Sequence, residues 1–88
     1  MHSATSALLR QRLEALVPSR LDIEDQSARH AGHPGALGGA HLRLAIVSAA
    51  FDGKNTRCRH RLVYDAAGDL LQGKIHALII EAQTPEEV

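Results

Sequence analysis

The spacing of apolar residues predicts two amphipathic helices. Between Ser6 and Pro18, leucines recur at helical intervals; Ser6 can cap the helix, and Pro18 ends it because proline cannot continue the hydrogen-bond ladder. A second helix is predicted over residues 57–71, where Gly68 weakens the middle by about 1 kcal/mol relative to alanine. Its apolar face contains Cys58, Leu62, Val63, Ala66 and Leu70.

Three shorter stretches have the pattern of β-strands. Residues 20–25 alternate polar and apolar side chains, as expected for a strand with one solvated face. Residues 41–48 alternate more regularly, and residues 74–80 form a short apolar run rich in β-branched side chains. Thr84-Pro85-Glu86-Glu87 then supplies a cap, a proline and acids, so a helical stub is expected there.

The order of these elements predicts one α+β domain over residues 1–88, in the order α-β-β-α-β-(α). The second helix connects two strands, which favours a parallel pair joined by a right-handed crossover. The first two strands can pair antiparallel across a long glycine-rich loop, residues 27–40. We therefore expect a three-stranded mixed sheet with helices packed on one face, and disorder in residues 1–5.

Composition narrows the class of protein. The formal net charge of the 88 residues is zero, so no global field attracts the chain to nucleic acid or to a membrane. The single cysteine excludes an intrachain disulfide and fits a reducing compartment. No secretory signal or membrane-length apolar run is recognised, so we expect a cytoplasmic protein.

Histidine is the compositional outlier, with six copies. His30 and His33 lie in the 27–40 loop and His41 follows it, so binding of a metal such as zinc or iron is one interpretation. Solvated loop histidines are the alternative, which the H-x-x-H spacing alone favours. For His76, near the start of the third strand, spacing alone favours a core histidine with a satisfied hydrogen bond over a ligand.

A basic segment, Lys54 followed by Arg57-Cys58-Arg59-His60-Arg61, precedes and begins the second helix. Cations oppose the helix dipole at this end, so contacts to phosphate or a protein partner are one interpretation, and a solvated first turn or ion pairs with nearby acids are the alternative. Cys58 is predicted to be a partly buried structural cysteine rather than a reactive thiol. The sequence contains no recognisable catalytic triad order, phosphate loop or pair of carboxylates, so we do not expect an enzyme.

Several short motifs together resemble the signature of the BolA family. The resemblance runs from about Leu8 to Glu87, and its most specific parts are Arg59-His60-Arg61-Leu62-Val63-Tyr64 and Ile75-His76-Ala77-Leu78. One departure is Leu42, where the family commonly has an aromatic residue. The other motifs are Asp25-Gln26-Ser27-Ala28-Arg29-His30, His41-Leu42, Val47-Ser48, Phe51-x-Gly53 and Thr84-Pro85-Glu86.

The resemblance implies a KH-like fold of the class II type and a monothiol glutaredoxin as partner. With glutathione, such a pair holds a bridging [2Fe–2S] cluster, and no cofactor is expected in the isolated protein. The family's invariant cluster ligand corresponds to His76. The second ligand, from the loop between the first two strands, corresponds to His30, with His41 as a nearby alternative and His33 less well aligned.

The leading hypothesis is therefore a non-enzymatic glutaredoxin partner in iron–sulfur cluster assembly, transfer or iron sensing. Two imidazoles in place of thiolates raise a cluster's reduction potential, and protons compete for imidazole near neutral pH, which suits delivery or sensing. The segment Lys54 to Arg61 would help form the partner interface. The alternative is a DNA-binding regulator that uses Lys54, Arg57, Arg59, His60 and Arg61. The sequence leaves open a monomer or a homodimer.

Overall fold

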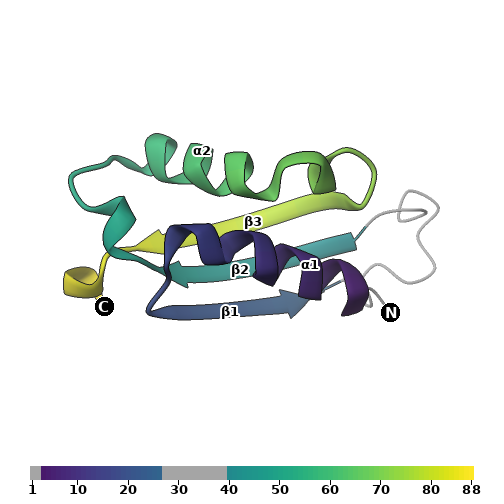
Figure 1. Cartoon of the computed structure of the whole chain (residues 1–88), viewed down its shortest axis with the longest axis horizontal. Helices are drawn as coiled ribbons and strands as arrows, with labels where there is room; N and C mark the ends of the chain where they lie inside the picture. The colour runs from purple at the N-terminus through teal and green to yellow at the C-terminus, as the bar shows by residue number, and fades with distance from the viewer. Residues whose placement is uncertain (1–2, 27–39) are drawn as a thin grey trace.

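The computed structural model describes residues 3–26 and 40–88, which form two layers, a sheet and the helices on it (Figure 1). A short 3-10 helix follows α1 at Glu14–Leu16, and another follows α2 at Gly68–Leu71. The main elements are α1 (Ser3–Leu13), β1 (Arg20–Asp25), β2 (Ala40–Val47), α2 (Thr56–Ala67) and β3 (Ile75–Gln83).

The three strands form one mixed sheet in the order β1-β2-β3. β1 pairs antiparallel with β2, and β2 pairs parallel with β3, so α2 is the crossover between two parallel strands. Both helices lie on the same side of the sheet (Figure 1). The predicted α+β class, element order and mixed topology are confirmed.

The core lies between this sheet and the two helices. Along β2, Ala40, Leu42, Leu44 and Ile46 are buried while His41, Arg43 and Ala45 alternate with them at greater exposure. Leu9 and Leu13 of α1, Val63 and Ala67 of α2, and Phe51 join the same cluster. The core is therefore aliphatic except for one ring, as the scarcity of aromatic residues requires.

The boundaries of the helices differ from the predicted ones. α1 begins at Ser3, so residues 3–5 are helical rather than disordered. α2 ends at Ala67 rather than continuing to residue 71, because Gly68 adopts φ 57° and ψ −127°, a conformation that only glycine enters at low cost. Gly68 therefore terminates the helix instead of weakening its middle, and a 3-10 helix continues from it.

The bounds of the strands agree closely with the predicted ones. β1 has the predicted bounds, and β2 begins one residue earlier than predicted, at Ala40. β3 extends to Gln83, and the stub after it is the short 3-10 helix Pro85–Glu87, capped by Thr84. Residues 27–39 of the predicted loop lie outside the described residues. In the described part of the chain, no helix has the length and apolar character needed to cross a membrane.

Candidate functional site

A β-bulge at the start of β3 positions His76. Ala40 pairs with Ile75 and His41 pairs with Ala77, so His76 is an extra residue that has no partner position on β2. The bulge also shifts the alternation of β3: Ile75 and Ile80 are both buried, although an odd spacing would place them on opposite faces of a regular strand. His76 is consequently exposed at the second position of β3, so the core histidine that spacing alone favoured is wrong.

The bulge brings His76 against His41 at the second position of β2. The two ring centroids are 5.0 Å apart and the ring planes are inclined by 43°. His41 is half-buried and His76 is exposed. The histidine pair, as we call these two residues, therefore lies at the end of the sheet where β2 and β3 begin, with His76 accessible and the Nε2 atom of His41 buried.

The spacing within the histidine pair fits joint binding of one metal ion. A metal–nitrogen bond of about 2.1 Å places each ring centroid roughly 3.2 Å from the metal, and two ligands at the tetrahedral angle then have centroids about 5 Å apart. Residues 3–26 and 40–88 contain no group of three or more metal-ligating side chains, so these segments alone offer the pair and no complete site. His30 and His33 lie outside the described residues.

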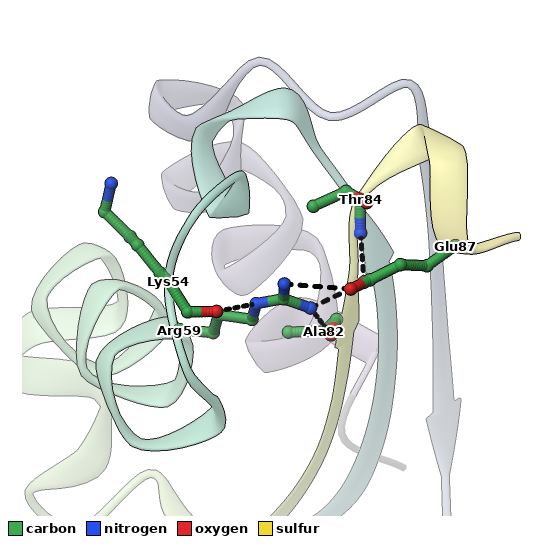
Figure 2. A network of polar contacts seen from close by, with 5 residues as sticks. All are labelled: Lys54, Arg59, Ala82, Thr84 and Glu87. Atoms are coloured by element: carbon green, nitrogen blue, oxygen red, sulfur yellow. Dashed lines mark hydrogen bonds and ion pairs between the residues drawn. The ribbon is translucent and has the colours of Figure 1, made fainter.

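The basic segment of α2 is divided between two environments. The guanidinium of Arg59 points inward, and its side chain is only 14% exposed. It donates to the carbonyl oxygens of Lys54 (2.7 Å) and Ala82 (3.2 Å) and to both carboxylate oxygens of Glu87 (2.6 and 3.0 Å), as Figure 2 shows. Arg59 therefore joins the start of α2 to the end of β3 and to the C-terminal stub.

Two predictions about this helix need correction. Cys58 is exposed, not partly buried, because the packed side of α2 follows Arg59, Val63 and Ala67 at intervals of four residues, and Cys58 lies one position away from that line. Arg59 was expected to be available to an external partner, but the inward hydrogen bonds occupy its guanidinium. Lys54, Arg57 and Arg61 are exposed and His60 is half-buried.

The histidine pair and the basic segment lie at opposite ends of the molecule. Arg59 contacts Ala82, which is six residues along β3 from His76, or about 20 Å. Figure 1 shows the same arrangement: α2 begins at the end of the sheet where β2 and β3 finish. The two groups are therefore separate, and the expected partner interface would have to extend about 20 Å along the sheet to include both of them.

Stability should depend on acid pH through Glu87. Hydrogen bonds from the Arg59 guanidinium and the Thr84 amide lower the pKa of Glu87 from 4.5 to about 2. Because the folded-state pKa is lowered, the carboxylate stabilises the fold fully above about pH 4.5, and this contribution disappears as pH falls towards 2. We expect Glu87→Gln to lower the free energy of unfolding modestly at pH 7, since the carboxylate is exposed to solvent screening.

Urea titrations of both forms across the pH range would measure this effect. The difference between the free energies of unfolding of the wild type and Glu87→Gln should be constant above about pH 5 and vanish near pH 2. Glu86→Gln is the matched control, because Glu86 is exposed and makes no ion pair within the described residues. A difference that does not change between pH 5 and pH 2 would contradict the assigned role of Glu87.

The geometry defines a class of protein: a small α+β domain with a three-stranded mixed sheet and two neighbouring imidazoles at one end, one of them exposed. The profile of BolA-like proteins matches residues 13–87. The chain belongs to the BolA-like family, and the resemblance drawn from its motifs is confirmed.

Solved structures and curated relatives agree with this assignment. The BolA domain of SufE1 from Arabidopsis thaliana is 49% identical, with 91% of each chain covered and a TM-score of 0.79. BolA1 from the same plant is 41% identical, with 93% of each chain covered and a TM-score of 0.80. BolA-like protein 1 from Bos taurus is 43% identical over 82 residues, which are 92% of this chain.

The matched region is only part of several curated relatives. This chain covers 59% of the length of the Bos taurus protein. It covers 24% of SufE-like protein 1, chloroplastic/mitochondrial, from Arabidopsis thaliana, to which it is 47% identical over 87 residues. The shared unit is therefore the BolA-like domain, and the activities of the longer proteins do not transfer with it.

Proposed function

We propose that this chain is a non-enzymatic partner of a monothiol glutaredoxin and shares a bridging [2Fe–2S] cluster with it. The complex would act in cluster assembly, in cluster transfer or in iron sensing. His76 would be one ligand from this chain, and a second histidine would be the other. Membership of the BolA-like family supports this class of function.

The observation that carries the proposal is the histidine pair. A [2Fe–2S] cluster needs four protein or thiol ligands, and two imidazoles whose ring centroids are 5.0 Å apart, with His76 exposed, would supply half of them. The partner's cysteine and the thiol of glutathione would supply the other half. Imidazole ligands carry no charge, so they raise the reduction potential relative to a cluster held by four thiolates.

The second ligand has two main candidates, His41 and His30, and His33 is a less well aligned third. His41 is already in ring contact with His76, which favours it among the described residues. His30 corresponds to the family's loop ligand, and its position is not described here. Both assignments are compatible with His76 as the fixed ligand, since the bulge on β3 holds that residue regardless of the loop.

Reconstitution with a partner tests the proposed function. The chain is mixed anaerobically with a monothiol glutaredoxin, glutathione, ferrous iron and sulfide, and the mixture is separated by size-exclusion chromatography. We expect a complex whose visible circular dichroism differs from that of the glutaredoxin loaded alone, because new ligands change the asymmetry around the iron. If the two proteins elute separately under all loading conditions, the proposal fails.

The DNA-binding alternative stays a prediction, and two features count against it. The guanidinium of Arg59 is bonded to Glu87 and to carbonyl oxygens, so one of the five residues expected to contact DNA is not available. Acidic side chains, Glu86 and Glu87, adjoin the same end of the molecule. The cytoplasmic location also stays a prediction.

A further inference from the structure

The outer side of α2 has an open hollow that the proposed cluster site does not use. Its volume is about 680 Å³, and its lining starts at the first turn of α2. The residues that line it follow one another along the helix: Thr56, Arg57, His60, Arg61 and Tyr64.

The cations of this hollow form no salt bridge within the described residues. Arg57 and Arg61 are exposed and make no ion pair there, whereas Arg59 between them is fully engaged. The first turn of α2 contains no acid, so the cations oppose the helix dipole. Arg57 and Arg61 are also four residues apart, a spacing at which like charges repel. The helix dipole and the repulsion between the two arginines both disfavour this arrangement, which points to an external anionic partner.

We propose that the hollow docks an acidic peptide segment of a partner protein. Two carboxylates would pair with Arg57 and Arg61, and an apolar side chain would pack against Tyr64, a residue that is 43% exposed. The helical rise places Arg57 and Tyr64 about 10 Å apart along the axis, which an extended segment of roughly three to four residues spans. The charge of the hollow and its one aromatic ring together define this occupant.

An acidic peptide fits the surroundings better than nucleic acid does. A phosphate backbone would extend beyond the two arginines, and exposed acids lie on both sides of them: Asp65 is one turn beyond Arg61, and Asp52 lies before the helix. The neutral net charge supplies no long-range attraction for a polyanion. A short segment places its carboxylates on the arginines alone and avoids these acids.

The test is an NMR titration of the uniformly ¹⁵N-labelled full chain. The probe is an acetylated and amidated Glu-Glu-Leu-Glu-Glu peptide, compared with the same peptide carrying glutamine in place of glutamate and with a short DNA duplex. We expect saturable shifts of the amides of Arg57, His60, Arg61 and Tyr64 with the acidic peptide only. The shifts should weaken as salt is raised, because the pairs are exposed.

Charge-reversal variants distinguish binding at the hollow from non-specific electrostatic attraction of the peptide. Arg57→Glu and Arg61→Glu should each weaken peptide binding by about tenfold or more, the loss expected for a hydrogen-bonded charge pair. Lys74→Glu reverses one exposed charge at the other end of the molecule and should change affinity less than about twofold. Arg57→Glu places an acid where the helix dipole favours it, so its unfolding midpoint should not fall.

Three results would overturn the proposal. The first is the absence of saturable shifts on α2, and the second is equal binding of the glutamine peptide. The third is tighter binding of the DNA duplex at the same residues, which would assign the hollow to nucleic acid. Because none of these measurements involves iron or glutaredoxin, failure here leaves the proposed cluster site untouched, and failure of that site leaves the hollow untouched.

Discussion

His76→Ala is expected to leave the domain folded and to lower the yield of cluster-bound complex by at least about tenfold. His76 is exposed and lies in a bulge, so truncation opens no cavity in the core. Loss of an outer-shell partner of a metal ligand already costs about 10- to 100-fold in affinity, and loss of a ligand itself should cost no less. Visible absorbance per mole of isolated complex measures the yield.

A matched control is available within the same chain. His60→Ala removes an imidazole from α2, far from the histidine pair, and should leave the yield unchanged. His41→Ala and His30→Ala then identify the second ligand, because only the true ligand should reduce the yield as His76→Ala does. Wild-type yield from His76→Ala would remove this residue from the site.

Phe51→Ala should cost about 3–5 kcal/mol of the free energy of unfolding. Phe51 is completely buried and is the largest of the fully buried side chains, and no second aromatic ring supports the same core. Small domains have total stabilities of only about 5–15 kcal/mol, so a large part of the stability should be lost. Urea denaturation followed by far-ultraviolet circular dichroism measures the change.

Two controls distinguish the effect of lost buried volume from the effect of removing any aromatic side chain. Phe51→Leu retains most of the buried volume and should cost clearly less than Phe51→Ala. Tyr64→Ala removes the other aromatic ring, which is 43% exposed, and should change stability by less than about 1 kcal/mol. Equal losses for Phe51→Ala and Tyr64→Ala would contradict the assignment of Phe51 to the centre of the core.

The fold was predictable because its main signals are local. The alternation in residues 20–25 matches β1 without error, and the helix between two strands correctly indicated a parallel pair. The prediction for Gly68 was wrong because a glycine in the sequence has the same appearance inside a weak helix and at a helix end. Its positive φ, which requires glycine, distinguishes the two only in the folded chain.

The candidate site was only partly predictable because it depends on long-range pairing. Sequence motifs identified His76, but its contact with His41 depends on a bulge between two strands that are distant in sequence. Ile75 and Ile80 are an odd number of residues apart, so burial of both would indicate a bulge. The apolar run over residues 77–80 hides the alternation, so the sequence does not show which of these residues are buried.

Arg59 shows a second limit of sequence interpretation. It precedes the buried Val63 by four residues and therefore lies on the packed side of α2. That spacing could have indicated an inward guanidinium, but its partner, Glu87, is 28 residues away in sequence. The basic motif therefore looked like one surface, although the fold divides it into an internal anchor and an external hollow.

The most direct test of the central claim is whether histidine nitrogen from this chain binds the iron. This chain is labelled with ¹⁵N-histidine, combined with unlabelled glutaredoxin and glutathione, and the reduced cluster is studied by electron–nuclear double resonance. We predict strong ¹⁵N couplings of directly bound imidazole, which His76→Ala reduces and His60→Ala leaves unchanged. A reduced cluster without any strongly coupled ¹⁵N would contradict the assignment of this chain as a cluster ligand.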